Sequence, residues 1–123
     1  MGNEALGIIR KSGGMYQKLE KLGKSFNELG QNLHPWIAPD ESIIVYTVKR
    51  PEEEPNSVLF CSFSQRDGAW SKPLEINLGM KASQPFITAD GKYLFFSSGE
   101  RGKGYIYWVD AKIIEELKPI NLK

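Results

Sequence analysis

The 123-residue sequence has a single cysteine, Cys61, and a single histidine, His34. One cysteine allows no intrachain disulfide, and one cysteine with one histidine cannot supply the usual ligand set of a zinc site. Charge of one sign is also lacking, because sixteen Lys and Arg residues are balanced by fifteen Asp and Glu residues. This balance argues against a nucleic-acid partner or an anionic membrane surface. We therefore expect no metal and no other cofactor.

Long apolar runs are absent as well. No stretch approaches the ~20 consecutive apolar residues that a membrane-spanning helix needs. Residues 1–11 lack a basic start followed by an apolar segment, so we expect no signal peptide in this chain. The Gly-x-Ser-x-Gly elbow, the phosphate-binding loop and the His-Glu-x-x-His motif are missing too, so no catalytic residue is assigned and a non-enzymatic protein is expected.

What the sequence does contain is an internal repeat of about fifty residues. Residues 34–46 align with residues 84–96 at a spacing of fifty. The matched pairs are Pro35 and Pro85, Ile37 and Ile87, Asp40 and Asp90, and Ile44 and Leu94. A second match, at a spacing of fifty-five, joins residues 13–20 to residues 68–75. A repeat of this length is typical of stacked supersecondary units, so it decides the predicted fold.

Each repeat unit predicts four antiparallel strands. Asp90-Gly91 between apolar runs is a strong hairpin signal, and it separates the first strand of its unit from the second. The expected second strands are 43–48 and 93–98, the third strands are 58–64 and 105–110, and the fourth strands are 70–76 and 15–22. Because the second and third strands are apolar on both faces, we expect every sheet to be covered on both sides. Phe95 and Ile106 should then pack between neighbouring sheets.

Stacked four-stranded sheets describe a β-propeller. The predicted fold is therefore all-β, a partial β-propeller of about two and a half four-stranded antiparallel blades, with a short helical turn near the C-terminus. Residues 1–30 would end a preceding blade, residues 31–79 would form a full blade, and residues 80–123 would form the last blade. Such a stack leaves apolar faces and strand edges open. We expect the chain to be either the C-terminal part of a longer propeller or a protomer that completes its sheets with further copies.

Residues 15–30 also fit a second prediction. The apolar residues of this region recur with a helical period: Met15, Leu19, Leu22, Phe26, Leu29 and Leu33. Against a helix, Gly23 and Gly30 each cost ~1 kcal/mol in a helix interior. The match to residues 68–75 likewise favours a strand followed by a loop. An amphipathic helix over residues 15–30 is the alternative.

The second unit carries a spaced series of motif elements: Pro85, residues 89–98, Arg101-Gly102 and residues 106–110. The first unit carries related elements: residues 34–46, Phe60 and residues 70–73. In these elements the chain resembles the TolB-type, WD-like propeller repeats of bacterial envelope proteins. It departs from that pattern at Glu41, which replaces the turn glycine, at Thr88-Ala89, which replaces Ser-Pro, and at Tyr105, which replaces the usual Asp.

The resemblance implies a periplasmic or cell-envelope protein. It implies a non-catalytic interaction module for a protein, a peptide or a glycan. The alternative function is the propeller part of a larger enzyme, because similar propellers gate serine peptidases or form carbohydrate-active lyases. The sequence does not identify the partner itself.

In a propeller, the loops that join fourth strands to first strands share one face with the loops that join second strands to third strands. Loops on a rigid scaffold commonly carry binding residues. The candidate partner-binding residues on and beside these loops are His34, Arg50, Gln84, Arg101 and Lys103. Other polar and aromatic residues are assigned structural roles. Asp40 and Asp90 should bond turn backbones, Cys61 should be a buried strand residue, and Trp36, Trp70 and Trp108 should be packing residues at equivalent places.

Overall fold

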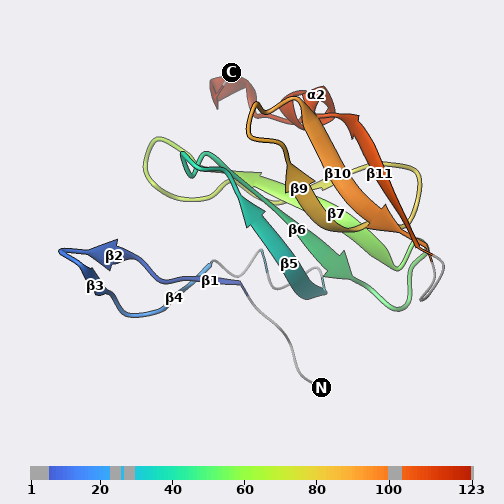
Figure 1. The fold of residues 1–123 in the computed structure, drawn as a ribbon. Helices are drawn as coiled ribbons and strands as arrows, with labels where there is room; N and C mark the ends of the chain where they lie inside the picture. Colours follow the sequence, from blue (N-terminus) through green and yellow to red (C-terminus); the bar gives the residue numbers. More distant parts are fainter. Residues whose placement is uncertain (1–5, 23–25, 27–29, 100–103, 123) are drawn as a thin grey trace.

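The computed structural model describes residues 6–22, 26, 30–99 and 104–122, and these residues form a mostly β protein. They make one four-stranded sheet, one three-stranded sheet and two two-stranded sheets (Figure 1). All the strand pairs are antiparallel. The prediction of an all-β, antiparallel fold is therefore confirmed.

The four-stranded sheet follows the chain in simple up-and-down order. Its strands are β5 (Gln31–Ile37), β6 (Ile43–Lys49), β7 (Ser57–Phe63) and β8 (Leu74–Ile76). The last strand is shorter than predicted, because Pro73 has no backbone N–H to donate and only an isolated bridge joins Ser64 to Trp70. Next to Trp70, the Ser71 hydroxyl accepts a hydrogen bond from the backbone N–H of Phe63, at 2.9 Å. The Ser71 side chain thus supplies a hydrogen bond where the regular backbone ladder between β7 and the segment before β8 is interrupted.

The three-stranded sheet has the order β11-β10-β9. Its strands are β9 (Ser83–Ile87), β10 (Tyr93–Ser98) and β11 (Tyr105–Asp110). The short helix α2 (Lys112–Glu115) and the 3-10 turn η1 (Ile120–Leu122) follow it, so the predicted helical turn is confirmed. Strand β9 lies against β5, β6 and β7, which stacks the two sheets.

The sequence repeat is also a repeat of backbone geometry. His34 and Gln84, fifty residues apart, both have positive φ angles, 48° and 54°. At both places the pairing register shifts, between Leu33 and Trp36 in one sheet and opposite Phe95 and Ser97 in the other. The same bulge therefore interrupts the first strand of each sheet.

The turns after β5 and β9 match as well. The carboxylate of Asp40 accepts a hydrogen bond from the N–H of Ser42, and that of Asp90 accepts one from the N–H of Lys92, each at 3.0 Å. The Thr88 hydroxyl also donates to the carboxylate of Asp90, at 2.6 Å. Hydrogen bonds from the side chains of Ser42 and Thr88, together with those from the two backbone N–H groups, favour the ionised carboxylates and lower the pKa of Asp40 and Asp90. The predicted structural role of the two residues is confirmed.

The first sheet buries both of its faces. Toward the second sheet, Val45, Leu59 and Cys61 pack with Ile87 and Leu94. On its opposite face the buried side chains come from the sheet and from the N-terminal region: Ile44, Tyr46, Val48, Val58, Phe60, Leu6, Leu22 and Phe26. The expectation of a sheet covered on both sides is confirmed for this sheet.

The second sheet does not meet that expectation. Ile106 is 76% exposed and Phe95 is only half-buried, so the prediction that Ile106 packs between sheets is wrong. The physical reason is that no described residue lies over the face that the second sheet turns away from the first. The strands of the second sheet are apolar on both faces, but one of these faces is exposed to solvent.

Residues 7–21 form one long, irregular hairpin. Its short strands are β1 (Gly7–Ile8), β2 (Lys11–Ser12), β3 (Met15–Tyr16) and β4 (Glu20–Lys21), with β1 paired to β4 and β2 to β3. Gly13 and Gly14 supply the positive φ angles of its turn, 59° and 80°. The hairpin extends away from the two larger sheets (Figure 1). The predicted strand over residues 15–22 is found as two short pieces, β3 and β4. The helical alternative is wrong for residues 15–22, whereas Phe26 is helical, and residues 23–25 and 27–29 lie outside the described residues.

Candidate binding surfaces

The exposed side of the second sheet, here called the outer face, carries mostly apolar side chains. The pairings of Phe95 with Phe86 and Trp108, and of Ser97 with Ile106, place these side chains on one side of the sheet. Trp108 is 60% exposed, and its ring meets that of Tyr93 edge-on, with 5.1 Å between centroids. Exposed aromatic patches of this kind mark interaction sites.

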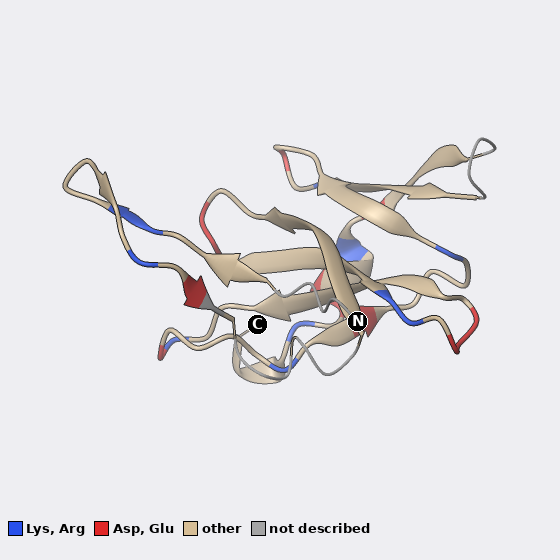
Figure 2. Ribbon diagram, turned by 90° about the horizontal axis from the view of Figure 1, so that it is seen from below, with Lys and Arg blue, Asp and Glu red and all other residues tan. Residues whose placement is uncertain are grey.

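Charged groups are nearly absent from this sheet. Its three strands contain one ionisable acid or base of the Asp, Glu, Lys and Arg types, Asp110. Elsewhere, basic and acidic positions alternate along the ribbon without a large region of one sign (Figure 2). The outer face therefore offers apolar contact area and almost no charged groups.

Strand β11 also has a free edge. In the first sheet, the corresponding strand β7 pairs with β8 through Leu59, Phe60 and Cys61. Among the described residues, β11 pairs only with β10. Its outer row of N–H and C=O groups is thus available to an added strand.

A polar pocket of about 340 Å³ lies where the loops after β8 and β10 meet. Its lining is rich in hydroxyl groups: Ser57, Ser83, Ser97 and Ser98, with Lys81, Gln84, Tyr105 and Ile106. The pocket therefore borders the outer face at Ser97 and Ile106. The Ser57 hydroxyl is already engaged, because it donates to the carbonyl oxygen of Ala82 at 3.0 Å. Of the predicted binding residues, Gln84 lines this pocket, and Arg101 and Lys103 lie outside the described residues.

Arg50 and His34 lie elsewhere. The Arg50 guanidinium donates to Glu75 Oε1 at 3.2 Å and to the carbonyl oxygen of Pro55 at 3.3 Å, and it forms an ion pair with Glu53. It therefore ties the loop after β6 to β8. His34 is exposed at the bulge of β5 and does not line the polar pocket. Among the described residues, His34, Arg50 and Gln84 are thus not gathered into one site.

A larger groove, of about 720 Å³, lies at the opposite end of the strands, between the turns after β5 and β9 and helix α2. Ile37, Pro39, Ala89 and Ile114 are among its lining residues. This groove is not predicted by the sequence patterns. Its only sequence signal is the apolar spacing of residues 113, 114 and 117, because the two turns that face the helix are fifty residues apart.

The three tryptophans occupy three different places, so the prediction of equivalent packing positions is wrong. Trp36, in the first strand, packs against the core between the two sheets, and Trp70, before β8, packs against the core on the opposite side of the first sheet. Trp108, in the third strand, is exposed on the outer face. Of the three, Trp108 is the one with an exposed side chain, and Trp36 is partly buried and lines the larger groove.

The reactive groups of the core are shielded. Burial raises the pKa of the Cys61 thiol to about 12, so this thiol is protonated and unreactive at neutral pH. Burial also raises the pKa of Tyr46, whose hydroxyl has no hydrogen-bond partner among the described residues. Within residues 6–22, 26, 30–99 and 104–122, no group of three or more His, Cys, Asp or Glu residues could hold a metal ion.

Comparisons with known proteins add no relative. No family model matches the chain, and no curated protein matches it. Among the described helices, none has the length and apolar character needed to cross a bilayer. Function is therefore inferred from the outer face, the free edge and the pockets.

Proposed function

We propose that the chain is a TolB-like β-propeller segment that acts as a non-catalytic interaction module in the bacterial envelope. Its partner is an extended segment of a protein or peptide, which binds at the outer face and at the free edge of β11. The observation that carries this proposal is the exposure of Ile106 and Trp108 on a strand with an unpaired edge. The propeller assignment is supported by the repeated bulge at His34 and Gln84.

The surface matches the requirements for binding by strand addition. A peptide that extends the sheet would gain main-chain hydrogen bonds from β11, and alternate side chains would lie on the outer face. Trp108 and Tyr93 offer large, rigid contact areas, which are typical of residues that dominate binding energy. Because the strands carry almost no charge, the expected ligand alternates apolar residues with residues of any polar type.

The polar pocket is a weaker basis for function. Its walls are divided between polar and apolar groups, and one of its four serine hydroxyls is committed to the backbone of Ala82. A glycan partner would require this pocket, because sugar hydroxyls need several convergent donors and acceptors. Glycan binding is therefore the competing outcome of the test.

The test is a selection of displayed random peptides on the purified chain, run in parallel with a glycan array. We expect selected peptides with alternating apolar residues, whose affinity falls at least about tenfold in a Trp108→Glu variant. Gln84→Gly is the matched control, because it removes a side chain from the polar pocket and tolerates the positive φ. Binding of glycans alone, with loss of affinity in Gln84→Gly and none in Trp108→Glu, would contradict the proposal.

A further inference from the structure

The internal repeat shows what kind of element fits the outer face. By strand register, Thr47, Leu59 and Cys61 of the first sheet correspond to Ser97, Ile106 and Trp108 of the second. The first three side chains are completely buried, because the second sheet lies over them. The outer face is thus the same surface one repeat later, and no described residue covers it.

The repeat also shows what fits the free edge. Strand β8 pairs with β7, with Leu74 opposite Cys61 and Glu75 opposite Phe60. By register, Cys61 and Phe60 correspond to Trp108 and Tyr107 on β11. An element that fits this edge is therefore a fourth strand with the character of β8.

The chain contains a second segment with that character. Residues 13–20 match residues 68–75, with identical residues at three positions: Gly13 and Gly68, Leu19 and Leu74, and Glu20 and Glu75. This segment lies in the hairpin, where Tyr16 is 73% exposed and Leu19 is 56% exposed. Among the described residues, β3 and β4 each pair on one edge only, so their other edge is free as well.

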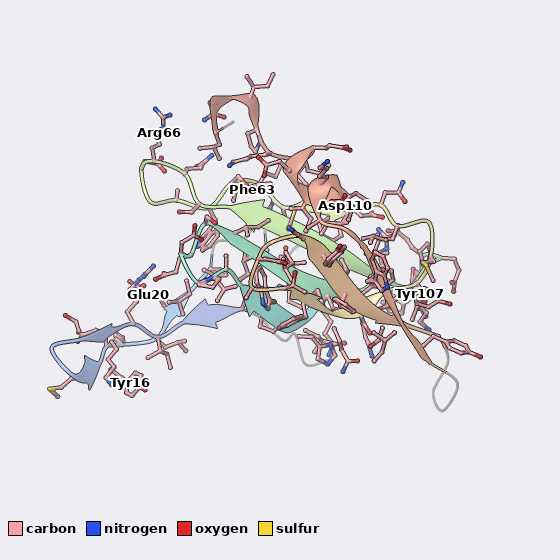
Figure 3. The ribbon with its side chains drawn as sticks, turned by 45° about the horizontal axis from the view of Figure 1, so that its top comes forward. Tyr16, Glu20, Phe63, Arg66, Tyr107 and Asp110 are labelled. Atoms are coloured by element: carbon pink, nitrogen blue, oxygen red, sulfur yellow. The ribbon has the colours of Figure 1, made fainter. Side chains whose placement is uncertain are left out.

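The hairpin cannot reach β11 of its own chain. Tyr16 on the hairpin and Tyr107 on β11 lie at opposite ends of the molecule (Figure 3). Arg10 also holds the hairpin near the turn after β5, since its guanidinium donates to Glu41 Oε1 at 3.1 Å. Any contact between the two segments must therefore join two molecules.

We propose that the partner of the outer face is a second copy of this chain, whose hairpin adds as a fourth strand beside β11. This inference rests on the binding surface of the proposed function. The repeat sets the register, with Leu19 of one copy opposite Trp108 of the other and Glu20 opposite Tyr107. The contact is head-to-tail, because the donor hairpin and the acceptor edge are different surfaces, and such contacts close into rings or extend into chains.

The experiment uses sedimentation velocity over a range of concentrations. Wild-type chain should associate, and Leu19→Glu and Trp108→Glu should each weaken association at least about tenfold, since a charge replaces an apolar contact. A mixture of the two variants should form a 1:1 complex, because one supplies an intact hairpin and the other an intact edge. Ile120→Glu, at an exposed site in η1 that belongs to neither the hairpin nor the second sheet, is the matched control and should leave association unchanged.

A disulfide cross-link tests the register directly. Tyr107→Cys in one copy and Glu20→Cys in the other should form a mixed disulfide, because directly opposite residues bring their Cβ atoms within ~5.5 Å. Tyr107→Cys with Ile120→Cys should not, and the buried Cys61 does not compete. A wild-type chain that remains monomeric, or a mixture of Leu19→Glu and Trp108→Glu that fails to associate, would overturn the inference. If selected peptides still bind such a chain, the proposed function stands without it.

Discussion

The backbone N–H of Gln84 donates a hydrogen bond to Oγ1 of Thr47, with 3.0 Å between nitrogen and oxygen. Thr47 belongs to β6 and is completely buried, and Gln84 belongs to the bulge of β9. The bond therefore joins the two sheets at the position where the bulge leaves an N–H outside the ladder. The positive φ of Gln84 thus has a role in stacking, apart from any role of its side chain.

Substitutions of Thr47 test the contribution of this hydrogen bond between the two sheets. Thr47→Val keeps the shape but leaves the Gln84 N–H without its acceptor, so we expect the free energy of unfolding to fall by about 1–3 kcal/mol. Thr47→Ser keeps the hydroxyl and should preserve more of the stability. Urea unfolding measures both variants. Equal midpoints for Thr47→Val and wild type would show that the bond does not stabilise the stack.

The exposure of the outer face predicts that substitutions at equivalent positions of the two sheets lower the free energy of unfolding by different amounts. Leu59→Ala creates a cavity between the sheets and should cost about 2–5 kcal/mol. Ile106→Ala, at the corresponding position of β11, should cost no more than about 0.5 kcal/mol in the monomer, because its side chain is solvated. Thermal unfolding at low protein concentration provides the comparison. Similar losses for the two variants would mean that something covers Ile106.

The turns after β5 and β9 predict changes of opposite sign. Glu41 and Gly91 both have positive φ angles, 61° and 75°, which only glycine adopts without cost. Glu41→Gly should stabilise the chain by about 0.5–1 kcal/mol, and Gly91→Ala should destabilise it by about 1 kcal/mol. Chemical denaturation of both variants tests the signs. A destabilised Glu41→Gly would indicate that the exposed Arg10–Glu41 contact outweighs backbone strain.

The burial of Cys61 predicts that its thiol resists alkylation in the folded chain. Its thiol is buried and its pKa is raised to about 12 by desolvation, so iodoacetamide at pH 7.5 should leave the folded chain unmodified. In 6 M guanidinium chloride the same reagent should alkylate it fully. Intact mass spectrometry follows the reaction. Rapid alkylation of the folded chain would contradict the packing of β7.

Much of the fold follows from local signals. The apolar runs, rich in β-branched and aromatic residues, and the Asp40 and Asp90 turns predict β6, β7, β10 and β11 to within one or two residues. The exposure of Ile106 and Trp108 could not be predicted in this way. An apolar pattern reports which surface a strand is able to bury, and it does not report whether a neighbour is present to cover it.

Contacts between residues far apart in the chain could not be predicted from the sequence either. Arg50 fits a binding residue by its place in a loop, but its bond to Glu75 joins residues twenty-five positions apart. The groove beside α2 depends in the same way on the stacking of two turns. The repeat shows that His34 and Gln84 are equivalent positions. It does not show that both residues have a positive φ angle.

Amide hydrogen exchange of β11 tests the central claim, that the outer face and free edge form a docking surface. In dilute solution we expect residues 105–110 to exchange much faster than residues 57–63, because β11 is an open edge and β7 is a buried central strand. At concentrations where the chain associates, or with a selected peptide present, residues 105–110 should become protected while residues 57–63 stay unchanged. Equal protection of the two strands at every concentration would contradict the claim.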